Sequence, residues 1–226
     1  MSFQQKTDYL NLGSTSLILV SSSENRSSQT ATAQDSKGDI IAQEIYGTTT
    51  APKCSYVVKS DTAVGNIKIG KASGLDNKYT ITNLTINTSA GSPPSVEASG
   101  EEIPSSTHDD CWYNVPSTTV EVCHHAQILF GAFSLTGAGN YLTQANYTVS
   151  GDLTKATKEG ETVAWDIANG QIKAALTIVS VGETAPTVTP GDGWTMTTPL
   201  TLEQGDAAYN SYTCELTLPL VHATAN

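Results

Sequence analysis

Alternation of apolar and polar residues with a period of two is the dominant pattern along this chain, and it is clearest in the second half. The apolar residues within 145–149 and within 212–218 are separated by single polar residues. Because neighbouring side chains of a strand point to opposite faces, each of these patterns predicts a strand with one buried face. The segment 172–181 carries apolar residues on both faces and predicts a strand that is covered on both sides.

The first half of the chain contains shorter apolar runs. They are Leu17–Val20, Ile40–Ile45, Tyr56–Val58, Ile67–Ile69, Tyr79–Ile86, Thr118–Val122 and Ile128–Leu135. Within Tyr79–Ile86 the apolar phase slips by one residue, which predicts a β-bulge. Glycine, proline, asparagine and aspartate separate the runs, as expected for turns. About ten strands at this spacing predict an all-β fold, an antiparallel β-sandwich or barrel.

Long loops and at most one short helix complete the expected fold. The polar segment 21–38 is predicted to be a long loop, and 47–53 and 101–117 are predicted to be shorter ones. The best helical signal lies at Leu200–Ala208, where Thr201 and Gln204 have the spacing of a capping box. We expect residues 1–226 to form a single domain, and a weak subdivision near 136–140 is the one boundary that the sequence offers.

Composition and charge exclude several classes of protein. The chain has a net charge of −11, with 11 basic residues, of which Arg26 is the sole arginine, against 22 acidic ones. Residues 1–78 carry 8 basic and 7 acidic residues, whereas 79–226 carry 3 and 15. Affinity for nucleic acid comes mostly from Lys and Arg that neutralise phosphates, so tight nucleic-acid binding is not expected. An anionic membrane surface is disfavoured for the same reason.

The sequence shows no targeting or membrane segment. The N-terminus lacks a basic region followed by an apolar stretch, and no segment approaches the roughly 20 apolar residues of a spanning helix. The four cysteines, Cys54, Cys111, Cys123 and Cys214, lie far apart. They are interpreted mostly as small buried hydrophobes.

A metal site is the first chemical hypothesis to consider. His108 and Cys111 precede a segment that ends in Cys123, His124 and His125. Zinc takes Cys and His ligands, but the usual pairs separated by two to five residues are missing here, so no metal ligand is assigned. A Cys111–Cys123 disulfide is the alternative if the compartment is oxidising.

The sequence also lacks the motifs that are expected of common catalytic sites. The chain has no Gly-x-Ser-x-Gly motif, and its acidic pairs, such as Asp109 and Asp110, are adjacent rather than opposed across a cleft. No phosphate-binding glycine loop is present. We therefore expect no enzyme activity and no cofactor.

Exposed aromatic and aliphatic residues provide the candidate interaction site. Trp112 and Tyr113 lie in a polar segment, where they could anchor a protein interface or contact a sugar. Ile40, Ile41, Ile45 and Tyr46 form the other candidate assembly interface. The three isoleucines could equally belong to the core.

The order of segments resembles the major tail (tail tube) proteins of long-tailed bacteriophages. The likeness is one of layout over most of the chain: a short N-terminal segment, a polar loop, then Gly38–Gly47, Thr85–Ile103, and a C-terminal part with Gly193–Met196, Leu200–Gln204 and Tyr209–Leu218.

The resemblance implies a β-sandwich protomer that assembles into stacked, hexameric rings and forms a tube for DNA passage. Its partners would be further copies of itself and other virion proteins, and it would be made in the host cytoplasm and reside in the virion. Alternatives are another virion protein, such as a decoration or baseplate protein, or an adhesin that binds glycan or a receptor.

Overall fold

A computed structural model describes most of the 226 residues. The described residues are 6–12, 16–60, 62–64, 68–69, 75–102, 111–114, 118–120, 128–129, 133–136, 139–156, 166–203, 209–220 and 222–224. Within them the fold is almost entirely β, and one 3-10 turn, η1 (Leu75–Asn77), is present. The expected all-β fold with antiparallel sheets is therefore confirmed.

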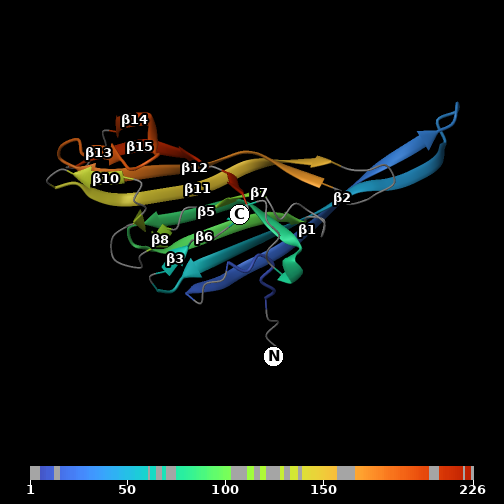
Figure 1. Ribbon diagram of the computed structural model, residues 1–226, viewed down its shortest axis with the longest axis horizontal. Helices are drawn as coiled ribbons and strands as arrows, with labels where there is room; N and C mark the ends of the chain where they lie inside the picture. Colours follow the sequence, from blue (N-terminus) through green and yellow to red (C-terminus); the bar gives the residue numbers. More distant parts are fainter. Residues whose placement is uncertain are drawn as a thin grey trace.

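One large sheet dominates the molecule (Figure 1). Its main path runs β1-β2-β6-β5-β11-β12-β15-β14, and every neighbouring pair along this path is antiparallel. The strands are β1 (Leu17–Gln34), β2 (Ile40–Val58), β6 (Ser92–Glu102), β5 (Tyr79–Ser89), β11 (Tyr141–Ala156), β12 (Asp166–Gly182), β15 (Asn210–Pro219) and β14 (Thr195–Glu203). Because β11 pairs with β5, the sheet contains strands from both sides of residues 136–140.

Shorter strands surround this path. β4 (Lys68–Ile69) pairs with β5, β7 (Cys111–Asn114) pairs with β4, and β16 (His222–Thr224) pairs with β7. A second sheet joins β10 (Phe133–Thr136) to β13 (Thr187–Pro190). A third joins β3 (Thr62–Val64), β8 (Thr118–Val120) and β9 (Ile128–Leu129).

The core lies on one face of the main sheet, where the alternation predicted from sequence places it. Tyr56, Val96, Ile86, Tyr147 and Leu176 lie opposite one another on the consecutive strands β2, β6, β5, β11 and β12, and all are buried. Cross-strand pairs of this kind stabilise a sheet because their side chains pack directly against one another. Leu10, Val188 and Trp194 pack on this layer from other segments. The strand 172–181 differs from the expectation. Every second residue from Ile172 to Ser180 is buried, and the residues between them are half-exposed or exposed, so only one face is covered.

The predicted bulge in Tyr79–Ile86 is confirmed. The β5–β6 register shifts between Ile81 and Asn83, which leaves Thr82 as the extra residue. Both Ile81 and Leu84 are therefore buried although they are three residues apart. A bulge lets one strand change its phase while it stays paired, which is the physical reason for the slip in the apolar pattern.

The expected loops at 21–38 and 47–53 are wrong. Residues 21–34 belong to β1, 47–53 belong to β2, and the two strands form one long hairpin joined by a turn at 35–39. A strand rich in serine and threonine can form without an apolar face when a partner strand provides its backbone hydrogen bonds. The hairpin extends well beyond the other strands of the sheet (Figure 1).

Two further expectations need correction. Leu200–Glu203 lie in strand β14 rather than in a helix, and 204–208 lie outside the described residues. Of the expected loop at 101–117, Glu101 and Glu102 end β6, and residues 111–114 form β7. The short apolar pattern of Leu200 and Leu202 is compatible with a strand and with a helical turn. This segment forms a strand because it pairs with β15.

Candidate assembly surface

The outer half of the long hairpin is a two-stranded ribbon, here called the arm (residues 27–49). The pairing between β2 and β6 covers only Lys53 to Val57. In the part of the chain that the structure describes, β1 is the sole strand paired with β2 from residue 40 to residue 52. Every side chain from Ser27 to Gln34 and from Ile40 to Ile45 is exposed. In these two segments the arm therefore presents both of its faces to solvent.

A rigid turn closes the arm. The Asp35 carboxylate accepts hydrogen bonds from the backbone N–H groups of Lys37 (2.8 Å) and Asp39 (2.9 Å). Gly38 has a positive φ of 88°, a conformation that glycine adopts without steric cost. The Asp35 N–H also bonds the Asp39 carbonyl at 2.9 Å. The turn thus holds the two strands of the arm together at their ends.

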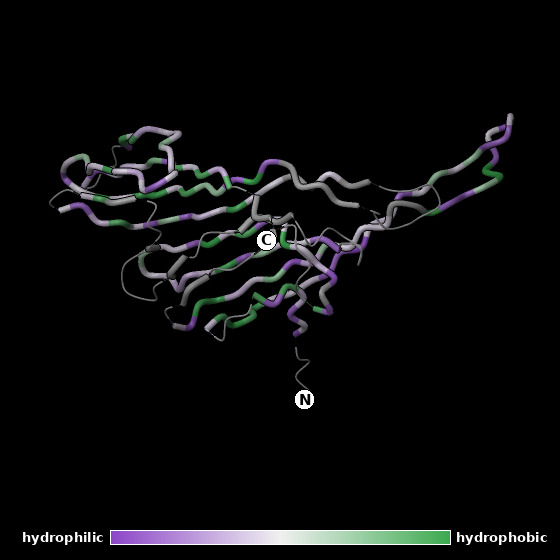
Figure 2. Tube along the Cα trace, viewed as in Figure 1, coloured by the Kyte–Doolittle hydropathy of each residue, from purple (hydrophilic) through white to green (hydrophobic). Residues whose placement is uncertain are grey.

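Exposed isoleucines distinguish the arm from an ordinary surface ribbon. Ile40, Ile41 and Ile45 are 60%, 67% and 57% exposed. Figure 2 shows apolar colour near the end of the arm, far from the core. A register shift between Ala33 and Gln34 leaves Ile41 unpaired, so it is the extra residue of a bulge. These side chains are not part of the core of this chain.

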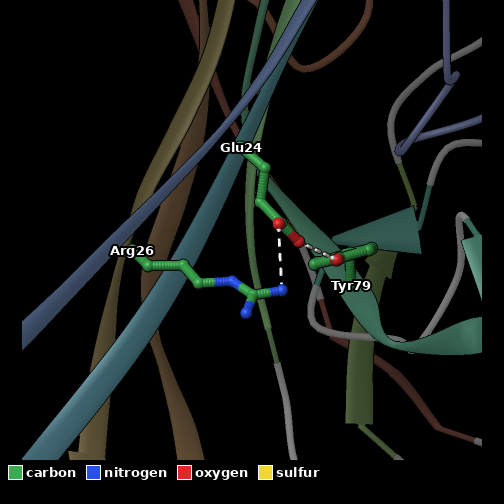
Figure 3. A network of polar contacts seen from close by, with 3 residues as sticks. All are labelled: Glu24, Arg26 and Tyr79. Atoms are coloured by element: carbon green, nitrogen blue, oxygen red, sulfur yellow. Dashed lines mark hydrogen bonds and ion pairs between the residues drawn. The ribbon is translucent and has the colours of Figure 1, made fainter.

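The arm is anchored to the body by a small polar network (Figure 3). Glu24 accepts a hydrogen bond from the Tyr79 hydroxyl at 2.6 Å and forms an ion pair with Arg26 at 3.1 Å. Burial and the neighbouring Glu24 carboxylate raise the pKa of Tyr79 well above its ordinary value, so Tyr79 stays a proton donor. Since Glu24 lies on β1 and Tyr79 on β5, the contact ties the base of the arm to the centre of the sheet.

The face of the main sheet opposite the core is polar. Asn83, Thr85, Asn146 and Thr148 lie there and are half-exposed. They bond to one another or to neighbours, as in the Thr85–Asn83 and Thr148–Asn146 pairs at 3.2 and 3.1 Å. The described charged residues on this face include Lys53, Lys173, Glu97, Glu203 and Glu215, so acidic residues outnumber basic ones there.

Part of this polar face is hollowed into a groove of about 610 Å³ between β1, β2, β6 and β5. Its lining is mainly hydroxyl groups, with Lys53 and Glu97 as the charged members. The lining contains no aromatic ring. The groove therefore offers hydroxyl, amide and charged groups for hydrogen bonding but no aromatic ring for stacking.

The other predicted site residues are only partly placed. Tyr46 lies in β2, and Trp112 and Tyr113 lie in β7, but their side chains lie outside the described residues. His108, Cys123 and the neighbouring histidines also lie outside them. In the ranges that are described, no group of three or more His, Cys, Asp or Glu residues could hold a metal ion.

The three isoleucines are interface candidates from the sequence, and the structure shows that they are exposed, but the arm that carries them was not predicted. The clue in the sequence is an uncharged run of Ser, Thr, Gln and Ala at 27–34 that is separated from a second β-prone run by Asp-Ser-Lys-Gly-Asp. A Gly-containing turn between two such runs is a hairpin signal.

Comparisons with known proteins do not identify a family. A scan with protein-family models finds no match to the chain, and a search of curated proteins finds none either. Within the described residues, no helix is long and apolar enough to cross a membrane.

Proposed function

We propose that this chain is a structural protein that binds further copies of itself, and that it forms the stacked, hexameric rings of a phage tail tube. The exposed arm is the structural feature that supports this proposal most strongly. A two-stranded hairpin alone is marginally stable in water. The apolar surface that it buries is too small to offset the conformational entropy that its backbone loses. An arm with three isoleucines more than half exposed is stabilised when a neighbour covers it.

The isoleucines alone do not supply enough free energy for a durable complex. Complete burial of one such side chain is worth about 1.5–3 kcal/mol, so the exposed fraction of the three gives roughly 3–5 kcal/mol. Association costs a similar or larger amount in lost freedom of motion. A second contact between copies is therefore required.

The open edges of the main sheet offer that second contact. Along the described path, β1 and β14 each pair with one neighbour and form the two edges. Because the path holds eight strands in alternating directions, the two edge strands run in opposite directions. Edge β14 of one copy could thus pair antiparallel with edge β1 of the next, and the polar faces would stay on the same side. Ring closure by such joints would remove both edges from solvent.

A closed ring of this kind would give the tube a polar wall. The polar face carries hydroxyl and amide groups and more acidic than basic residues, and it includes no arginine at its described positions. DNA would find few groups there that neutralise phosphates, so it would pass without being held. The acidic C-terminal two-thirds of the chain adds to the repulsion. Other virion proteins would then cap the tube, and the protein would reside in the virion.

Replacement of the isoleucines tests the role of the arm. We expect the triple variant Ile40→Thr, Ile41→Thr, Ile45→Thr to remain folded, because all three side chains are exposed and threonine keeps the β propensity. Its self-association, measured by sedimentation velocity, should weaken by at least about tenfold, which corresponds to 1.4 kcal/mol.

The matched control is Leu75→Thr, which replaces an exposed apolar residue (40% exposed) away from the arm. Association that is unchanged in the triple variant, or reduced equally in the control, would contradict the role of the arm.

A further inference from the structure

The long hairpin carries an apolar surface at each of its two ends. At the end distant from the arm, Ile18 and Val20 of β1 are 49% and 43% exposed. Ile18 is paired with Val57 of β2, so their side chains share one face. The two ends of the hairpin lie far apart (Figure 1), because 18 residues of extended strand span about 60 Å.

Basic residues border the apolar residues at this end. The Lys6 ammonium group donates a hydrogen bond to the Val20 carbonyl. Lys53 precedes Val57 by four residues on the same face of β2, and Lys59 follows the strand directly, where its N–H bonds the Ser16 carbonyl at 2.8 Å. All three lysines are exposed. The basal patch is defined here as Ile18, Val20 and Val57 with Lys6, Lys53 and Lys59.

The opposite charge predominates at the tip of the arm. Asp35, Asp39 and Glu44 lie beside Ile40, Ile41 and Ile45, against the one cation Lys37. The basal patch has two acidic neighbours: Glu97, which is paired opposite Ser55, and Asp8, which lies two residues from Lys6 and accepts a hydrogen bond from the Tyr56 hydroxyl. The tip therefore has an excess of two negative charges, and the basal patch has an excess of one positive charge.

We propose that the tip of the arm of one copy binds the basal patch of a second copy. This inference rests on the proposed self-assembly and names the two surfaces that meet. Apolar residues at the centre of each surface would be buried together, and the charged residues around them would be complementary, which favours this pairing over others.

Another exposed apolar cluster is a less suitable partner for the tip. Tyr141, Leu202 and Tyr209 are 64%, 48% and 51% exposed. The β11, β12, β15 and β14 register brings the first two to the same end of the sheet. Glu183 and Glu203 are exposed beside them, and no Lys or Arg follows Lys173 in the sequence. The acidic tip would be repelled there.

Such a contact joins two different surfaces of the same chain. Each copy gives its tip to one neighbour and receives a tip from another, which is a heterologous contact. A contact of this type repeats without limit unless the rotation between copies closes a ring. It would extend the assembly along the long axis of the hairpin, in the direction in which rings are stacked.

Charge reversal on the full-length protein tests the pairing. The tip variant is Asp39→Lys, Glu44→Lys, and the patch variant is Lys53→Glu, Lys59→Glu. Each variant alone presents like charges at both surfaces, so we expect its apparent association constant by sedimentation velocity to fall at least about tenfold. An equimolar mixture of the two variants restores opposite charges at every contact and should recover association to within about threefold of the original protein.

The control variant is Lys78→Glu, Lys173→Glu, which replaces two exposed lysines elsewhere and changes the net charge as the patch variant does. It should associate normally. Recovery in the mixture together with a normal control supports the pairing. Association of the single variants at the original strength, or weakening that the mixture does not reverse, would overturn the pairing and leave self-assembly standing. An original protein that stays monomeric would overturn both.

Discussion

Burial of Cys214 in the sheet raises the pKa of its thiol from an ordinary value of 9.0 to about 11. The folded chain therefore holds this proton more tightly than the unfolded chain does. Its contribution to stability is complete below pH 9 and is lost as the pH rises through the folded pKa near 11. Cys54 and Tyr56 act in the same direction, because burial raises both of their pKa values.

The expected result is a loss of unfolding free energy between pH 8 and pH 10.5 that is smaller in Cys214→Ala than in the original protein. The difference should be at most about 2–3 kcal/mol, the value of a two-unit shift. Urea unfolding of both proteins at the two pH values measures it. Equal losses in the two proteins would show that Cys214 does not contribute.

Buried residues of the sheet were largely predictable from alternation. Tyr147, Val149 and Leu216 occupy the face that the sequence pattern indicates, because a period of two leaves only one way to bury every second side chain. The burial of Thr80, Thr88 and Ser180 was not predictable. Their hydroxyl groups resemble surface residues in the sequence and are accommodated in the core only by specific partners, such as the Ala145 carbonyl for Thr88.

At the scale of elements, the arm is the part of the fold with the least support from the rest of the chain. Its backbone hydrogen bonds join two strands only, and both faces are exposed. Local opening of such a ribbon costs little free energy. The β1–β2 segment within the body has the β6 strand as a further neighbour and tertiary anchors at Glu24 and Tyr79.

Hydrogen exchange should reveal this difference. In the monomer we expect amides of 29–34 and 40–45 to exchange at least about 100-fold faster than those of Cys54 and Tyr56 in the same strand pair. In the assembled protein the arm amides should become protected. Arm amides that exchange equally fast before and after assembly would show that no neighbour covers the arm.

The sequence did not predict the arm because strand prediction depends on an apolar face. Residues 27–34 lack one, and all of their side chains are exposed. Polar composition therefore indicated a loop, although the backbone pairing is regular. The apolar run Ile40–Ile45 was visible in the sequence, but it could have belonged to the core or to an interface. The exposure of these residues in the structure excludes the core of this chain.

At the scale of the whole molecule, assembly depends on features that are separate in the sequence. The arm, the basal patch and the edge strands β1 and β14 come from both ends of the chain. The acidic charge and the all-β class could be predicted from the sequence, because they follow from composition and from local patterns of residues. The relation between the two ends of one hairpin is a property of register and length, and it becomes visible only in three dimensions.

The most direct test of self-assembly is electron microscopy of the purified full-length protein by negative stain, with light scattering on the same sample. Self-assembly predicts rings or tubes of constant bore and a scattering mass many times the 23.7 kDa of one chain. A strictly monodisperse monomer at high concentration and at varied salt would contradict it, and would leave the arm to serve a different partner.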